Sequence, residues 1–193
     1  VNLAKVEVFV GALIGAMLVY LFSSLAIRAV GHAASDIIEE VPRQFREDPG
    51  ILAGTSKPDF ARCVDITTRA ALREMVLPGV LAVGVPTIVG VTLKAEATAG
   101  LLMVGTIAGI MLATVLNNGG GAWDNAKKFI EAGYMKSDDG GIIGKGTPTH
   151  AAAVVGDTVG DPFKDTAGPS LHVLVKLLST ITLVLAPFFI AKG

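Results

Sequence analysis

The sequence is poor in the residues that mark secreted or nucleic-acid-binding proteins. Cys63 is the only cysteine among 193 residues, so the chain cannot form an internal disulfide. No Asn-X-Ser/Thr glycosylation sequon occurs. Charged residues make up 17% of the chain, the net charge is −1, and no basic patch with interleaved aromatic residues is present. These shortages argue against a disulfide-stapled secreted domain and against nucleic acid as a partner.

Apolar residues are abundant instead. They make up 51% of the chain and the mean hydropathy is +0.61, values typical of an integral membrane protein. The chain starts at Val1 in an apolar stretch that lacks a methionine, a basic n-region and a cleavage site, so we do not interpret this stretch as a signal peptide. We expect the chain to be a piece of a longer protein.

Four apolar segments are long enough to cross a bilayer. Residues 8–27 carry no charge and, at 1.5 Å per residue, span about 30 Å. The other segments are residues 75–93, residues 97–123, and a fourth that starts near Thr166 and contains Lys176. We therefore predict an all-α fold, a single polytopic bundle with four transmembrane helices. The predicted helices cover about 7–40, 70–93, 96–132 and 152–191, with loops at about 41–69 and 133–151.

Proline, glycine and short polar stretches predict local details of this bundle. The apolar segments contain small residues suited to close helix packing, among them Gly11, Gly15, Gly100, Gly105 and Gly109. Pro78 and Pro86 should kink the second helix, and residues 94–96 form a very short polar turn. Residues 59–74 also have a helical pattern, with Asp65 and Arg69 placed to form a surface ion pair.

The distribution of lysine and arginine predicts the orientation. Residues 28–73 and 124–165 together carry twelve of these cations, whereas Lys5, Lys94 and Lys192 are the three on the other side. The excess of positive charge places both long loops in the cytoplasm and both chain ends outside.

Residues 156–176 contain the first candidate site. Asp157, Asp161 and Asp165 recur every four residues, so on a continuous α-helix they share one face, and that face continues to Lys176. Like charges at this spacing destabilise a helix unless something neutralises them, and Mg²⁺ prefers carboxylates and bridges to phosphate. Lys176 lies in an apolar run, where a cation that looks buried marks an ion pathway. The plain alternative for the aspartates is a solvated acidic helix face.

Residues 123–129 contain the second candidate site. Asp124, Lys127 and Lys128 are spaced to project from one helical face. One interpretation is an ordinary ion pair at the membrane–water interface, with Trp123 as the interfacial anchor. The other is a carboxylate for a metal and two ammonium groups for phosphate oxygens. This segment by itself favours neither.

Two long motifs resemble the C-terminal part of the membrane-bound, ion-pumping inorganic pyrophosphatases: GGAWDNAKKFIE at 120–131 and GDTVGDPFKDTAGPS at 156–170. Three further segments resemble the same family in the same order, VPRQFRE at 41–47, KPDFARCVDIT at 57–67 and ALREM at 71–75. The resemblance covers essentially the whole chain. It implies a homodimer with sixteen transmembrane helices per subunit, of which this chain holds the last four, in a multi-pass protein of a prokaryotic cell membrane.

The resemblance also implies an activity: hydrolysis of pyrophosphate by in-line attack of water, assisted by Mg²⁺ and coupled to pumping of H⁺ or Na⁺. Dependence on K⁺ stays open, because its determinants lie upstream of Val1. The residues implied at the site are Asp124, Asp157, Asp161 and Asp165 for metal, Lys127, Lys128 and Lys164 for pyrophosphate, Asp161 and Asp165 for catalysis, and Lys176 for the ion gate. A partner aspartate for Asp165 and the acidic partners of Lys176 are expected on helices outside the chain, so we expect this chain alone to be inactive.

Other interpretations remain open from the residues alone. The aspartates suit a non-enzymatic membrane subunit that binds cations, and a transporter of anions is a weaker alternative. Three lysines beside four aspartates favour a phosphate–metal site, which needs both signs of charge. His172 stands where the family resemblance leads us to expect asparagine. We interpret it as hydrogen-bonded to a neighbouring helix rather than as a titrating group near the gate.

Overall fold

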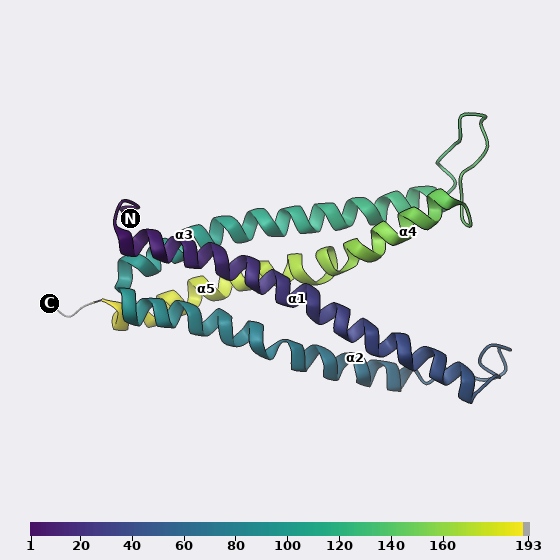
Figure 1. Cartoon of the computed structure of the whole chain (residues 1–193), viewed down its shortest axis with the longest axis horizontal. Coiled ribbons are helices and arrows are strands. Elements are labelled where there is room, and N and C mark those ends of the chain that lie inside the picture. The colour runs from purple at the N-terminus through teal and green to yellow at the C-terminus, as the bar shows by residue number, and fades with distance from the viewer. Residues whose placement is uncertain (191–193) are drawn as a thin grey trace.

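The computed structural model describes residues 1–190, which form helices and loops (Figure 1). Within these residues the only β-type pairing is an isolated bridge between Lys136 and Ile142. The predicted all-α fold is confirmed. The elements are α1 (Val6–Glu47), α2 (Phe60–Glu74), α3 (Val76–Glu131), α4 (Pro148–Asp161), the π-helix η1 (Pro162–Ala167) and α5 (Gly168–Phe189).

Three helical stretches are long and apolar enough to cross a membrane: Val6–Glu47, Phe60–Glu131 and Pro148–Phe189. The second is interrupted at Lys94, which has φ 69° and ψ −174°, and there two helices meet. In Figure 1 the two halves of α3 run back from this point along different sides of the bundle. The reversal falls inside the predicted turn at 94–96.

The helix termini differ from the predicted ones. α1 continues past residue 40 to Glu47, because Arg43 pairs with Glu40 at 2.7 Å and also with Glu47. α2 fills much of the predicted loop at 41–69, and the carboxylate of Asp59 caps it by accepting the Arg62 N–H at 2.9 Å. The predicted end of the last helix at residue 191 lies outside the described residues.

Pro78 and Pro86 lie within α3 without breaking its helical backbone, and the kinks expected at them stay a prediction. The non-helical backbone angles are at Lys94, and the backbone stays helical at Pro78 and Pro86. Pro78 lies in the first turn of α3, where its missing N–H would have no intrahelical partner.

Small residues bring α1 and the second half of α3 close together, as predicted. A β-carbon on Gly15 would stand 3.0 Å from the Leu101 carbonyl carbon, and one on Gly100 would stand 2.6 Å from the Val8 carbonyl oxygen. In lipid, where apolar burial gives little driving force, such close packing is a main source of helix association. The side chains around it form one apolar core that includes Leu18, Phe22, Leu101, Leu171, Leu174 and Leu178.

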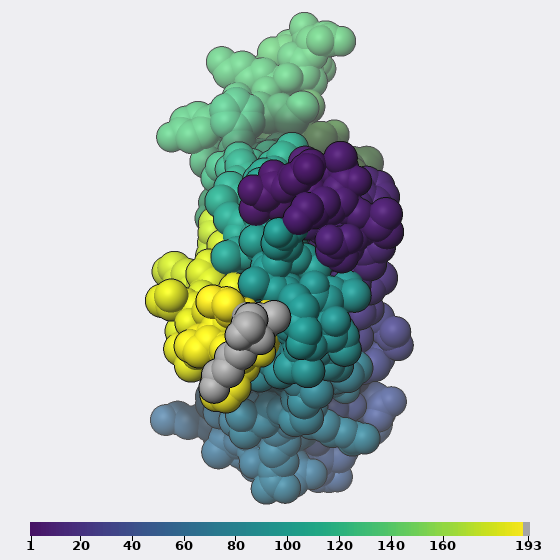
Figure 2. All heavy atoms as spheres, turned by 90° about the vertical axis from the view of Figure 1, so that its left-hand side faces the viewer, coloured from purple at the N-terminus to yellow at the C-terminus, as the bar shows by residue number. Residues whose placement is uncertain are grey.

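The two ends of the bundle differ. Figure 2 looks onto the end where the start of α1, the α3 reversal and the end of α5 gather, and there Lys5 pairs with Glu96 at 2.5 Å. Toward the opposite end the α1–α2 pair and the α3–α4 pair separate (Figure 1). α2 buries no residue and α4 buries only Asp157 and Gly160. The candidate site lies on this more open end, between α3 and α4.

Candidate functional site

Glycines allow α3 and α4 to approach until their backbones touch. A β-carbon on Gly120 would stand 2.5 Å from the carbonyl oxygen of Gly160 and 2.9 Å from the β-carbon of Lys164. The indole of Trp123 covers Gly156 and Gly160, and its ring lies 6.2 Å from that of Phe163. Trp123 therefore packs against α4 through one face, in addition to any contact with the membrane interface.

This close approach assembles one network of charged side chains from both candidate motifs. Lys164 lies 2.7 Å from Asp161 and 3.1 Å from both Asp124 and Asp157. Lys127 pairs with Asp157 and lies 3.7 Å from Asp124, and Lys128 lies 2.8 Å from Asp124. We call these six residues the charge network: Asp124, Lys127, Lys128, Asp157, Asp161 and Lys164.

The charge network is graded from buried to exposed. The side chain of Asp157 is only 9% exposed, those of Asp124 and Lys164 are 18% and 17% exposed, and that of Lys128 is 65% exposed. Three carboxylates face three ammonium groups, so their formal charges cancel. The network thus joins several charges of each sign in one place, unlike a solvated acidic face or a single surface ion pair.

The lysines keep the carboxylates ionised. Asp124 follows the charge-free run of α3, outside the apolar segment, and its hydrogen bonds with Lys128 and then Lys164 lower the pKa of its carboxyl to about 2. Lys127 lowers the pKa of Asp157, which lies well before the apolar part of α5. In the same way Asp161 is the main cause of a raised pKa of Lys164. Both signs of charge therefore persist throughout the physiological pH range.

The donor atoms of the network suit Mg²⁺, which prefers carboxylate oxygens. Within residues 1–190, however, no three acidic, histidine or cysteine side chains are arranged to hold a metal ion. Lys164 explains why, because its ammonium occupies the space among Asp124, Asp157 and Asp161. The residues fit a magnesium site in their chemistry, provided that the carboxylates exchange this ammonium for the metal.

The three aspartates do not lie on one continuous α-helix as expected, because Asp165 lies in a π-helix that follows Asp161. Asp157 and Asp161 both contact Lys164, whereas Asp165 is exposed and has no hydrogen bond or ion pair to another side chain within residues 1–190. Asp165 itself lies within the π-helix η1. A π turn takes one residue more than an α turn, so it rotates the following chain by about 100° relative to a continuous α-helix.

Pro169 gives a local reason for this π-helix. In a continuous α-helix its N–H would bond to the Asp165 carbonyl, but proline has no N–H and its ring clashes with that carbonyl. The N–H of Gly168 instead reaches back five residues to the Phe163 carbonyl. The motif at 156–170 thus contains the proline that favours a π-helix in the turn with Lys164 and Asp165.

Lys176 is not buried within this chain. It lies on α5 with an exposed side chain, and no ion pair joins it to any residue that the structure describes. The expected buried environment is therefore absent from residues 1–190. His172, one turn before Lys176, lies 3.5 Å from the side-chain amide of Asn117 on α3. This contact agrees with the interpretation of His172 as hydrogen-bonded to a neighbouring helix.

Comparison with known proteins identifies the relatives of this chain. Residues 1–185 match the family described as inorganic H⁺ pyrophosphatase. The chain belongs to this family. It is 66% identical over 190 residues to K(+)-insensitive pyrophosphate-energized proton pump 2 of Moorella thermoacetica, and 65% identical over 189 residues to a pump of the same kind from Caldanaerobacter subterraneus. A relative in Clostridium tetani, 50% identical over 193 residues, carries the name of a K(+)-stimulated pyrophosphate-energized sodium pump.

These inorganic H⁺ pyrophosphatase relatives are much longer than this chain. The matches cover 98% of the chain in the first two relatives and all of it in the third, but only 27%, 26% and 28% of the relatives themselves. The chain therefore spans about a quarter of the length of these pumps.

Sequence reasoning missed the glycines that let this pyrophosphatase segment assemble its charge network. Gly156 and Gly160 are four residues apart and face Trp123, and Gly120 faces Gly160. The signal was present in the sequence, because small residues at a spacing of four are a known mark of close helix contacts.

Sequence reasoning also missed Glu131. Its carboxylate pairs with His150 at 2.9 Å and so holds the loop at 132–147 against the start of α4. The backbone N–H of His150 donates to the Thr147 hydroxyl, which caps α4.

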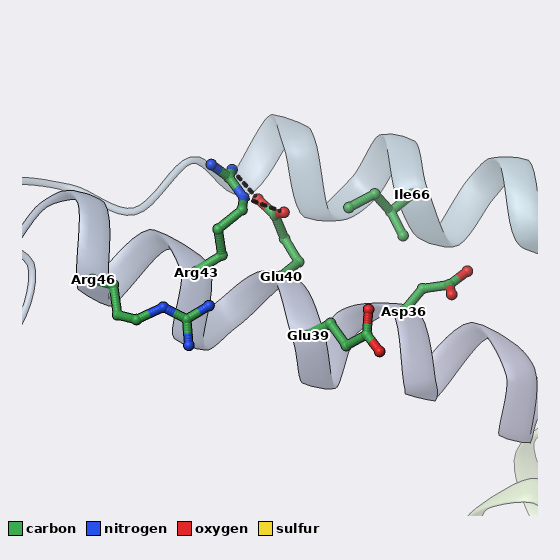
Figure 3. Close-up of a pocket in the computed structure, with 6 residues that line it drawn as sticks. All are labelled: Asp36, Glu39, Glu40, Arg43, Arg46 and Ile66. Carbon is green, nitrogen blue, oxygen red and sulfur yellow. Dashed lines mark hydrogen bonds and ion pairs between the residues drawn. The ribbon is translucent and has the colours of Figure 1, made fainter.

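A separate pocket of about 450 Å³ lies between α1 and α2 (Figure 3). It is lined by Asp36, Glu39, Glu40, Arg43, Arg46 and Ile66. Figure 3 shows Arg43 and Glu40 bonded to each other rather than directed at open space, and Gln44 joins the same contact by accepting the Asp59 N–H at 2.8 Å. These bonds fasten α1 to the start of α2, so we assign this region a structural role.

Proposed function

We propose that the complete protein hydrolyses pyrophosphate to two phosphates and couples this reaction to pumping of H⁺ or Na⁺. The charge network carries the proposal, because carboxylates and ammonium groups interleaved in one place suit a substrate that combines phosphate oxygens with metal ions. The family membership supports it. The relatives at 66% and 65% identity carry the names of K(+)-insensitive proton pumps, so we expect H⁺ rather than Na⁺ and no requirement for K⁺.

The lysines of the network would bind the pyrophosphate oxygens. Lys127 and Lys164 come from different helices and point into the same space, and Lys128 extends it toward solvent. As ammonium groups they would hold the non-bridging oxygens and stabilise the negative charge that grows on the leaving phosphate.

The aspartates would provide the oxygen ligands for metal. Asp124, Asp157 and Asp161 already converge on one cation, the Lys164 ammonium, and Asp165 follows Asp161 by four residues. Mg²⁺ held by these carboxylates would neutralise the phosphate oxygens and activate the leaving group when bound.

Asp165 would act on the attacking water. Its carboxylate, with a partner from a helix outside this chain and with Asp161 nearby, would orient the water and accept its proton. The water oxygen would form a bond to phosphorus in line with the bridging P–O bond, which breaks and releases phosphate. The exposed position of Asp165 in η1 is consistent with a partner that comes from another part of the protein.

Lys176 would be the ion gate, buried and paired by helices of the complete protein. In this proposal the reversal at Lys94 separates two crossings, giving four crossings in all, which would be the last four of sixteen in each subunit of a homodimer. The charge network and the loops at 48–59 and 132–147 would face the cytoplasm of a prokaryotic cell, in keeping with the positive charge on that side. Many apolar residues remain exposed on α2, α4 and α5, among them Leu72, Val155 and Val173, and these would contact lipid or the remaining helices.

The test is Mg²⁺-dependent phosphate release from pyrophosphate by membranes that carry the complete protein. Asp165→Asn should lower the rate by about 10²-fold or more, because it removes a general base. Asp138→Asn is the matched control, since Asp138 is an exposed aspartate in the loop outside the network. Absence of hydrolysis by a folded, membrane-inserted protein would contradict the proposal and favour a cation-binding subunit or an anion transporter.

A further inference from the structure

The position of Lys164 suggests more than a contact to substrate. Its ammonium is the only cation of the charge network that reaches all three carboxylates, at 2.7 Å from Asp161 and at 3.1 Å from Asp124 and Asp157. The side chain is 17% exposed, and its β-carbon lies close to Gly120 of α3. The ammonium is thus held at the meeting point of α3, α4 and η1.

Carboxylate groups that converge on one cation also provide the oxygen ligands that a divalent metal ion prefers. An ammonium and a metal ion cannot occupy the same space, and within residues 1–190 the acidic side chains form no metal site while Lys164 is there. We propose that Lys164 is a built-in competitor of the metal: it holds the three carboxylates together, and it moves to a phosphate oxygen when metal and pyrophosphate bind. This inference rests on the proposed function and adds a second role for Lys164.

The exchange would make metal and pyrophosphate binding depend on each other. Metal alone would displace Lys164 and leave an ammonium without a partner in a largely buried site, which is unfavourable. Pyrophosphate alone would draw the lysines away and leave the carboxylates unpaired. When both bind, the carboxylates face metal and the lysines face phosphate, so each ligand raises the affinity for the other by the same factor.

The experiment measures Mn²⁺ binding to the purified complete protein in the absence of pyrophosphate, by electron paramagnetic resonance of free Mn²⁺. Lys164→Met keeps most of the aliphatic stem but removes the charge, whereas Lys164→Arg keeps the charge. Asp157→Asn should abolish Mn²⁺ binding at the charge network, because Asp157 is the most buried carboxylate of the network. Lys136→Gln is the control, since Lys136 is exposed and lies outside the network.

We expect Lys164→Met to bind Mn²⁺ roughly tenfold more tightly than the unmodified protein, because a competing cation is gone. Lys164→Arg and Lys136→Gln should stay within about twofold of the unmodified protein. Unchanged or weaker binding in Lys164→Met would overturn the proposal. Equal tightening in Lys164→Met and Lys164→Arg would also overturn it, since packing rather than charge would then be the cause.

Two further measurements keep the test decisive. If Lys164→Met does not fold, Lys164→Gln replaces it, because glutamine is also uncharged and keeps a polar group in this partly exposed position. It should tighten Mn²⁺ binding roughly tenfold, and a change within about twofold would overturn the proposal. Pyrophosphate hydrolysis by the unmodified protein is measured in parallel. A protein that does not hydrolyse pyrophosphate contradicts the proposed function, whereas the Mn²⁺ affinities alone decide whether Lys164 competes with metal.

Discussion

Gly120 of α3 and Gly160 of α4 are in backbone contact: a β-carbon on Gly120 would stand 2.5 Å from the Gly160 carbonyl oxygen. The charge network depends on this contact, because Asp124 and Lys127 come from α3 while Asp157, Asp161 and Lys164 come from α4 and η1. We predict that Gly120→Ala forces the two helices apart and lowers pyrophosphate hydrolysis by the complete protein at least about tenfold, since small displacements of reacting groups are costly.

The neighbouring glycines provide matched controls for this variant. Gly119 and Gly121 lie in the same Gly-Gly-Gly run, but a β-carbon at either would meet nothing within 4 Å in the described structure. Gly119→Ala and Gly121→Ala should therefore keep most of the activity. Equal loss in all three variants would show that the run matters for another reason than the contact with Gly160.

The contact between α1 and α3 predicts an effect on stability. A β-carbon on Gly15 would stand 3.0 Å from the carbonyl carbon of Leu101, which is backbone and cannot rotate away. Gly15→Ala should destabilise the complete protein by about 1–3 kcal/mol, the usual cost of overpacking. The midpoint of thermal unfolding in detergent measures this. Gly31→Ala is the control, because Gly31 is exposed and has no neighbour within 4 Å. An unchanged midpoint in Gly15→Ala would contradict the close packing.

The Asp124 carboxyl predicts a pH dependence. Hydrogen bonds with Lys128 and Lys164 lower its pKa in the folded protein to about 2, below the ordinary 3.8. A lowered pKa means that its stabilising contribution is complete above about pH 4 and disappears as the pH falls toward 2. The difference in unfolding midpoint between the unmodified protein and Asp124→Asn should therefore be constant from pH 5 to pH 8 and shrink below pH 4. A difference that changes between pH 5 and pH 8 would contradict the assigned pairing.

The π-helix predicts a separation of hydrolysis from pumping. Pro169→Ala restores the N–H that an α-helix needs at this position, and we expect η1 to convert to α-helix and to rotate Lys176 relative to Asp157. Because both residues would act in one coupled cycle, the number of ions pumped per phosphate released should fall by roughly half or more. Pro187→Ala, in α5 but far from η1, is the control. An unchanged ratio in Pro169→Ala would show that the π-helix has no part in coupling.

The sequence was sufficient to predict the all-α fold and the position of the helix reversal, for physical reasons. Long charge-free runs indicate transmembrane helices without any knowledge of tertiary contacts, and the reversal at Lys94 occurs within the short polar turn between two such runs. The prediction that Gly15 and Gly100 permit close packing was also correct, because residue size alone limits how near two helices approach.

Other features depend on information that a helical repeat does not contain. The uniform spacing of four predicted one continuous α-helix through Asp157, Asp161 and Asp165, but the chain becomes a π-helix from Pro162 to Ala167. The meeting of Lys164 with Asp124 requires contact between two helices, and the motifs alone did not specify which lysine would occupy the centre. Lys176 looked buried in the sequence because its neighbours are apolar. Burial of this side chain needs helices that cover it, and within residues 1–190 the Lys176 side chain is exposed.

We propose that pyrophosphate hydrolysis at the charge network drives ion transport. The most direct test reconstitutes the complete protein into sealed vesicles and records internal acidification together with phosphate release after addition of Mg²⁺ and pyrophosphate. We predict that both occur in the unmodified protein and that Asp157→Asn abolishes both, because Asp157 contacts Lys127 and Lys164 at the buried centre of the network. Hydrolysis and acidification that persist in Asp157→Asn would contradict the account.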